Sequence, residues 1–140
     1  MPQPEDFRIE DAPLPEPRDG EMLIANHILS MDPAIRGFLD DRPSYLPPVA
    51  IGATVRGMTL GRVLSSRKPG FEPGTMVRAL AGWEECSLIS EAIGLETVQV
   101  APQVPLEVYM GALGAAGLTA WIGLHEIGRI RAGETVLISA

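Results

Sequence analysis

Few side chains in this sequence are suited to acid–base or nucleophilic chemistry. The chain holds two histidines, His27 and His125, and one cysteine, Cys86. Their spacing supports no His–Cys catalytic pair. We interpret His27 as a strand residue and His125 as a cation near a helix C-terminus, where the helix dipole favours positive charge. Cys86 follows Glu84 and Glu85, and nearby carboxylates disfavour a reactive thiolate, so we interpret it as a packing residue.

A second group of candidate residues lies between two expected strands. Tyr45 sits in the loop "PSYLPP", and a loop residue placed by a rigid scaffold can bind a ligand or simply cover the mouth of a barrel. Both interpretations stay open from the residues alone. Asp32 and Arg36 are four residues apart on an expected helical turn, so the spacing predicts an ion pair between them.

The glycines of "GALGAAG" resemble a phosphate-binding loop only superficially. They follow an expected helix, whereas a dinucleotide-binding loop follows a strand and opens a helix. The sequence therefore predicts no phosphate site in this stretch.

The elements that must position these residues begin with strands. Asp32 as an N-cap and Pro33 at the first helical position predict a short helical turn. Gly57 and Gly61 lie inside a strand pattern and predict a bulge or a barrel corner. The expected strands are Phe7–Glu10, Glu21–Ser30, Thr54–Ser66, and the runs "TMVRALAG" and "WEECSLIS".

From Pro105 onward the apolar period is that of helices, with Gly114 to Gly117 dividing two of them. The run Thr135–Ile138 is short, apolar and β-branched, which is typical of a buried parallel strand. Strands with glycine corners, then helices, then one buried strand predict a mainly β fold. We expect a partly open barrel followed by the start of an α/β unit.

Composition narrows the classes of function. The chain has 140 residues, 46% hydrophobic residues and a net charge of -7, which exclude global disorder and argue against nucleic acid as a partner. The uncharged stretch Val108–Leu124 is shorter than the roughly 20 residues that span a bilayer, so no membrane partner is expected. A single cysteine excludes an internal disulfide, and no signal peptide opens the chain; a cytoplasmic location is expected.

Taken in order, the segments resemble the N-terminal part of the medium-chain dehydrogenase/reductase superfamily. Within it they are most similar to the zinc-independent prostaglandin reductase or 2-alkenal reductase branch. The resemblance covers nearly the whole chain and rests on "PEPRDGEMLI", "LSMDPAIRGFLDDRPSYLPPVAIG", "RGMTLGRVLSS", "FEPGTMVRALAGWEE" and "LGAAGLTAWIGLHEIGRIRAGETVLISA".

The resemblance implies a GroES-like barrel at residues 1–105. Residues 106–140 would hold linking helices and the first strand of a truncated nucleotide-binding domain. In the family a glycine-rich loop that receives the NADPH pyrophosphate follows "VLISA". The chain is therefore expected to be a fragment that is inactive alone.

The family's chemistry, as the resemblance implies it, is hydride transfer from NADPH to the β-carbon of an enone or enal substrate. The resemblance would place Tyr45 and Arg36 at the substrate, and Asp32, Pro33 and Thr119 at the cofactor. The catalytic residue is unknown, because the family's proposed catalytic tyrosine lies beyond residue 140. No metal is expected, since "SMD" and "GMT" stand where zinc-dependent members have cysteine and histidine ligands. Ala34, Thr75 and Cys86 depart from the branch pattern.

Two other hypotheses remain. A truncated, non-enzymatic barrel module would serve protein association, and a domain excised from a polyketide-type enoyl reductase would require sequence before Met1. The apolar C-terminal elements predict a homo-oligomer, because an unpaired strand and helix expose apolar surface.

Overall fold

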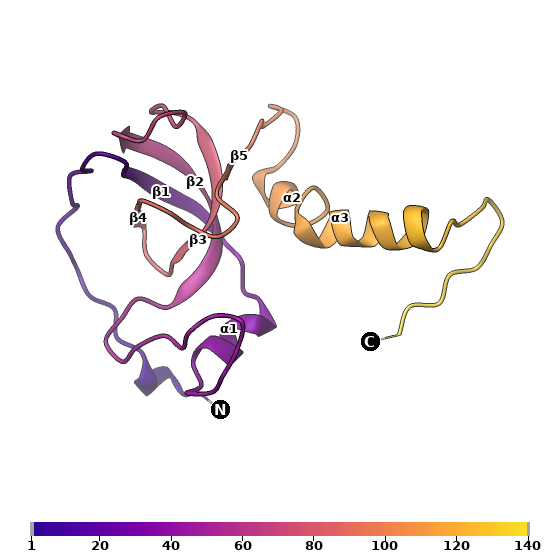
Figure 1. Cartoon of the computed structure of the whole chain (residues 1–140), viewed down its shortest axis with the longest axis horizontal. Helices are drawn as coiled ribbons and strands as arrows, with labels where there is room; N and C mark the ends of the chain where they lie inside the picture. The colour runs from indigo at the N-terminus through magenta and orange to yellow at the C-terminus, as the bar shows by residue number, and fades with distance from the viewer. Residues whose placement is uncertain (1, 140) are drawn as a thin grey trace.

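The computed structural model describes residues 2–139. The chain enters through a 3-10 turn, η1 (Pro4–Asp6), and an extended arm, and its main body is a curved sheet (Figure 1). A short helix, α1, follows the first strand, and the last helices extend away from the sheet. The elements are β1 (Met22–Leu29), α1 (Pro33–Phe38), β2 (Arg56–Ser66), β3 (Met76–Gly82), β4 (Cys86–Ile89), β5 (Glu96–Thr97), α2 (Leu106–Met110), α3 (Ala115–Trp121) and the π-helix η2 (Ile122–Ile127).

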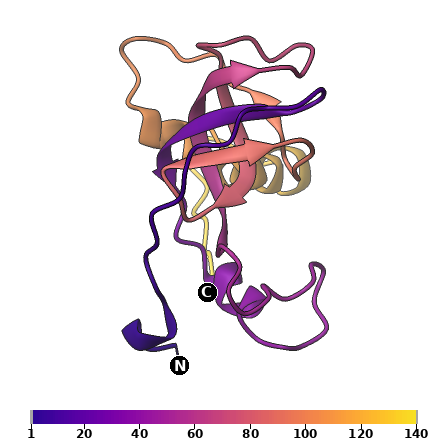
Figure 2. The same cartoon turned by 90° about the vertical axis from the view of Figure 1, so that its left-hand side faces the viewer.

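The five strands form one antiparallel sheet in the order β4-β1-β2-β3-β5. Figure 2 shows the strands turning around a common interior, yet the two edge strands β4 and β5 are not paired with each other. The fold is therefore mainly β and is a partly open barrel of GroES-like type. This confirms the predicted fold class.

The core lies inside this curved sheet. Met22 and Ile24 of β1, Val63 of β2 and Val77 of β3 are almost fully buried and pack with Ile89 of β4. Alternation along each strand places these side chains on one face. Because burial of each large apolar side chain contributes about 1.5–3 kcal/mol, this cluster is the main source of stability for the sheet.

A second buried cluster attaches the first linking helix to the sheet. Tyr109 of α2 packs with Leu60 and Met76. The Tyr109 hydroxyl accepts a hydrogen bond from the Ala101 amide at 2.8 Å, and its carbonyl accepts one from Arg78 Nη1 at 2.8 Å. Since Arg78 also pairs with Glu96 of β5 at 2.5 Å, a single guanidinium joins β3, β5 and α2.

Gly61 lies at a bulge between the two central strands, as the sequence predicted, whereas Gly57 pairs with Ala81 without a register shift. The register between β1 and β2 shifts between Asn26 and Ile28, opposite Gly61. A Cβ at position 61 would lie 2.5 Å from the Ala25 carbonyl oxygen. The bulge therefore depends on the missing side chain.

Two of the expected strands are wrong. Residues Phe7–Glu10 form no strand; Phe7 instead stacks on Trp83 with ring centroids 6.0 Å apart, and Ile9 is 99% exposed. Thr135–Ile138 also forms no strand, and Leu137 is 94% exposed. A strand needs a neighbouring strand to accept its hydrogen bonds, and neither run has one among residues 2–139.

The helical prediction is confirmed with one change. Gly114 stands at the N-cap of α3, so it separates α2 from α3, but Gly117 lies inside α3 and divides nothing. Across residues 2–139, no helix combines the length and the apolar character that crossing a bilayer requires.

The close approach at Gly61 yields a stability prediction. Gly61→Ala should lower the free energy of unfolding by about 1–3 kcal/mol, because the new methyl group would clash with the Ala25 backbone, which is held in the sheet. Gly37→Ala is the matched control: its Cβ would meet nothing within 4 Å, and alanine favours a helix. Urea denaturation of the two variants measures the difference, and equal midpoints would contradict the close approach.

Candidate functional site

The candidate site is built around α1 and the loop of residues 39–55 that follows it. Ser30 leaves β1 with its amide bonded to the Met58 carbonyl at 2.8 Å, which fixes the start of the turn on β2. Pro33 begins α1, as predicted, and Asp32 occupies the N-cap. The Asp32 carboxylate makes no capping bond; it accepts the Ser30 hydroxyl at 2.6 Å instead.

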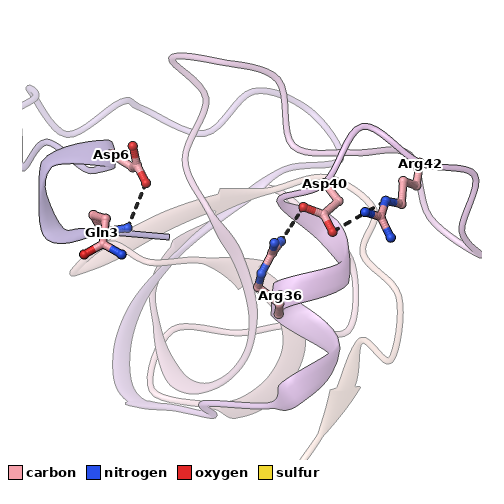
Figure 3. A network of polar contacts seen from close by, with 5 residues as sticks. All are labelled: Gln3, Asp6, Arg36, Asp40 and Arg42. Atoms are coloured by element: carbon pink, nitrogen blue, oxygen red, sulfur yellow. Dashed lines mark hydrogen bonds and ion pairs between the residues drawn. The ribbon is translucent and has the colours of Figure 1, made fainter. Parts of the chain in front are cut away.

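Arg36 has a different partner from the one expected. Its Nη1 donates to Asp40 Oδ1 at 2.5 Å, and Arg42 Nε approaches the other carboxylate oxygen at 3.9 Å (Figure 3). The predicted Asp32–Arg36 ion pair is therefore wrong. Asp32 is engaged by Ser30 at the helix start, whereas Asp40 lies just past the helix end, on the side that the Arg36 side chain reaches.

The same arrangement sets the ionisation of Asp40. The hydrogen bond from Arg36 lowers the pKa of the Asp40 carboxyl below its ordinary value, partial desolvation opposes this, and the charges of Arg36 and Arg42 add to the lowering. The carboxylate is therefore held ionised at the C-terminal end of α1. All three side chains are partly open to solvent, so the pair contributes modestly to stability.

Tyr45 lies on the loop with most of its side chain in solvent. It is 75% exposed, and its ring meets the edge of the buried Phe38 ring at 5.5 Å between centroids. Next to it, residues 41–44 and 46–48 line a hollow of about 350 Å³. The phenol is thus presented to solvent beside a concave surface.

Thr119 is not brought together with the residues around α1. It lies on α3, which Figure 1 shows beside the sheet while α1 lies below it. Its hydroxyl donates to the Ala115 carbonyl at 2.8 Å, one turn earlier in the helix. The oxygen can still accept a hydrogen bond, so its predicted role toward a carboxamide stays a prediction.

The remaining chemical candidates are dispersed. His27 is exposed at the β1 bulge, His125 packs against Trp121 at 5.4 Å, and Cys86 pairs with Ala25 in the sheet. In the part of the chain that the structure describes, no three His, Cys, Asp or Glu side chains gather as a possible metal site.

Sequence reasoning missed Arg56, the first residue of β2. Its guanidinium lies 5.3 Å from the centroid of the Phe38 ring, and its Nη2 donates to the Pro47 carbonyl. The signal available in the sequence was a lone arginine between a Pro-Pro loop and a strand. Arg56 also borders a second hollow, of about 220 Å³, with Thr54, Glu84 and residues 80–82 and 87–92.

A partly open antiparallel barrel with a helical turn and a proline-rich loop at one end is the architecture of GroES-like domains. Residues 1–98 match the family described as the N-terminal domain of oxidoreductase, and the chain belongs to this family. The resemblance to the zinc-independent medium-chain dehydrogenase/reductase branch is confirmed by the relatives. All of those described below carry names of reductases.

The chain is 39% identical over 139 residues to the NADPH-dependent curcumin reductase of Escherichia coli (strain K12), covering 99% of the chain and 40% of that protein. It is 36% identical over 121 residues to the NADP(+)-dependent 2-alkenal reductase of Nicotiana tabacum, covering 86% and 35%. Mouse (Mus musculus) prostaglandin reductase 1 is 35% identical over 136 residues, covering 96% and 39%.

Solved structures agree with the sequence relatives. The crystal structure of CurA from Vibrio vulnificus superposes with a TM-score of 0.76 at 32% identity, covering 95% of the chain and 39% of CurA. The same protein in complex with NADPH gives a TM-score of 0.75. The chain thus spans about two fifths of the length of the curated relatives described above.

The Asp40 arrangement yields a pH prediction. Because the folded pKa lies below the ordinary value of about 4, the stabilisation from Asp40 is complete above that value and is lost as the pH falls through the lowered pKa. A carboxyl ¹³C NMR titration should show Asp40 titrating below the unfolded chain. Arg36→Ala should raise this pKa more than Arg42→Ala, whose partner atom is farther away; equal shifts would contradict the assignment.

Proposed function

We propose that this chain is the substrate-side part of an NADPH-dependent oxidoreductase that reduces the C=C bond of α,β-unsaturated ketones or aldehydes. The observation that carries the proposal is the match along 99% of the chain to an NADPH-dependent curcumin reductase. The similarity to an NADP(+)-dependent 2-alkenal reductase and a prostaglandin reductase supports the same class of substrate.

The proposal divides the chain into two parts. Residues 1–105 form the barrel on the substrate side, and residues 106–140 link it to a nucleotide-binding domain. The positions of β5, which ends at Thr97, and α2, which begins at Leu106, support a boundary between them. Tyr109 keeps the first linking helix attached to the barrel.

The proposed chemistry gives the residues around α1 a role in binding the substrate. NADPH, when bound, supplies the hydride for the β-carbon of the substrate, and a proton then adds at the α-carbon. The oxygen of the resulting enolate requires hydrogen-bond donors. Tyr45 offers an exposed phenol and Arg36 a partly exposed cation for this oxygen, which is the substrate-binding role we propose for them.

The described residues fit only one end of the cofactor. Asp32 and Pro33 at the start of α1 are the residues we propose for contacts with the nicotinamide ring. Thr119 lies on α3, away from α1 (Figure 1), so the proposed contact of its hydroxyl oxygen with the carboxamide requires α3 to lie nearer α1 in the whole protein. Residues 2–139 contain no strand that leads through a glycine-rich turn into a helix, so they do not fit the pyrophosphate. We therefore propose that residues outside this chain hold most of NADPH, and that the chain alone is inactive.

The proposed reaction needs no zinc. Residues 30–32 and 57–59 offer no thiolate or imidazole, which are the ligands that zinc prefers in catalytic sites. In their place a proline-rich loop and an aromatic pair shape this end of the barrel. Activation of the carbonyl would then rest on hydrogen-bond donors alone.

One observation favours a second candidate function, a module for protein association. Large apolar side chains are exposed along the C-terminal elements: Leu118, Trp121, Ile122, Ile127, Val136, Leu137 and Ile138. Apolar surface of this kind is normally covered by another domain or another copy. We propose that it is covered in the working protein, and that a homo-oligomer forms if no nucleotide-binding domain covers it.

Isotope transfer tests the proposed reaction. The whole protein from which this chain comes, given NADPH deuterated at C4 and an α,β-unsaturated ketone, should place deuterium on the β-carbon of the saturated product. Mass spectrometry with NMR of the product reads the position. Deuterium on the carbonyl carbon would contradict the proposal, because it would show reduction of C=O instead.

The 140-residue chain is the control for the same experiment. It should show no NADPH binding by calorimetry and no turnover. Size-exclusion chromatography of this chain should show self-association. A monomer that turns over an enone would contradict both the missing cofactor site and the role of the exposed C-terminal elements.

A further inference from the structure

The loop of residues 39–55 carries Tyr45 but has few backbone hydrogen bonds of its own. Pro47 and Pro48 follow each other and have no N–H to donate, so this part of the loop can only accept hydrogen bonds. The Val49 amide donates to the Phe38 carbonyl at 2.7 Å and closes the loop onto the end of α1. The backbone between Tyr45 and Val49 can therefore be fixed only by a side chain that donates a hydrogen bond to one of its carbonyls.

Arg56 supplies that donor. It begins β2, where pairing with Gly82 of β3 fixes its backbone in the sheet. From there its Nη2 donates to the Pro47 carbonyl. Its Nε is buried without a hydrogen-bond partner among the described residues, which lowers the free energy of unfolding. The contacts of the guanidinium with Pro47 and Phe38 must offset this loss.

The same guanidinium is linked to Tyr45 through one ring. Arg56 lies over Phe38 at 5.3 Å, and Tyr45 meets Phe38 at 5.5 Å in an edge arrangement. Phe38 is only 4% exposed, so the ring is fixed between them. A cation over an aromatic face and an edge-on aromatic pair each contribute about 0.5–1.5 kcal/mol, so the cluster is able to select one loop conformation.

We propose that Arg56 is a positioning residue, which holds the loop through Pro47 and Phe38 and so places the Tyr45 phenol where the substrate binds. The proposal rests on the proposed function for the role of Tyr45 toward a substrate. The loop-holding step does not depend on it. Arg56 itself touches neither substrate nor cofactor in this scheme.

The loop-holding step is tested by hydrogen–deuterium exchange in the intact protein. A peptide covering residues 45–50 has no amide at Pro47 or Pro48, so it reports on Leu46, Val49 and Ala50. Arg56→Ala should speed its exchange roughly tenfold, the effect of losing one hydrogen bond to a charged group. Arg62→Ala is the matched control, because Arg62 makes the same kind of bond, to the Gly74 carbonyl at 3.1 Å, from farther along β2.

Kinetics with an enone test the positioning step. Arg56→Ala should lower kcat/KM roughly tenfold, with part of the loss in kcat, because a displaced phenol weakens the hydrogen bond to the oxygen that becomes the enolate. Arg56→Lys should restore only part of the loss, since an ammonium can reach the Pro47 carbonyl but lacks a planar face for Phe38. The double variant Arg56→Ala with Tyr45→Ala should be no worse than Tyr45→Ala alone.

The outcomes separate the two proposals. If the unmodified protein reduces no enone, the proposed function fails, and exchange alone decides whether Arg56 holds the loop. Unchanged exchange in Arg56→Ala overturns the loop-holding step. Additive effects of the two alanine substitutions on kcat/KM, or full rescue by lysine, overturn the positioning role.

Discussion

The pairing of β1 with β2 is the constraint on which the rest of the structure depends. Both strands are central in the sheet, and their antiparallel register brings Leu29 opposite Thr59. The end of β1 and the start of β2 therefore lie at the same end of the barrel. Residues 30–55 leave and return at that end, so α1 and its loop are held there, whatever their own hydrogen bonds contribute. The bulge opposite Gly61 shifts this register by one residue. The absence of a side chain at Gly61 therefore helps to set the position of the site.

The elements that could be predicted from sequence are those with a local cause. Glu21–Ser30 is long, apolar and free of glycine and proline, and β1 spans Met22–Leu29; Pro33 begins α1 because its φ suits a first helical turn. The failures at Phe7–Glu10 and Thr135–Ile138 have a non-local cause. A strand exists only with a partner strand, and an apolar run carries no information about whether a partner is present.

The site follows the same division. The helical turn and its loop were predictable from the Asp-Pro pair and the proline cluster, but the roles of Asp32, Pro33, Arg36 and Tyr45 at a substrate or cofactor were implied only by the family resemblance. The carboxylate that pairs with Arg36 could not be predicted, because Asp32 and Asp40 are both four residues away in sequence. In the fold, Asp32 accepts the Ser30 hydroxyl and Arg36 donates to Asp40. Arg56 escaped notice because its partners, Phe38 and Pro47, are brought to it by the fold and not by spacing.

The two tryptophans sit in contrasting surroundings, and this has a spectroscopic consequence. Trp83 is half-buried, stacks on Phe7 and has its indole nitrogen shielded from water, whereas Trp121 is 52% exposed beside His125. Their emission maxima should differ, with Trp83 the bluer of the two. The chain therefore contains separate optical reporters for the barrel and for its C-terminal helices, without any added label.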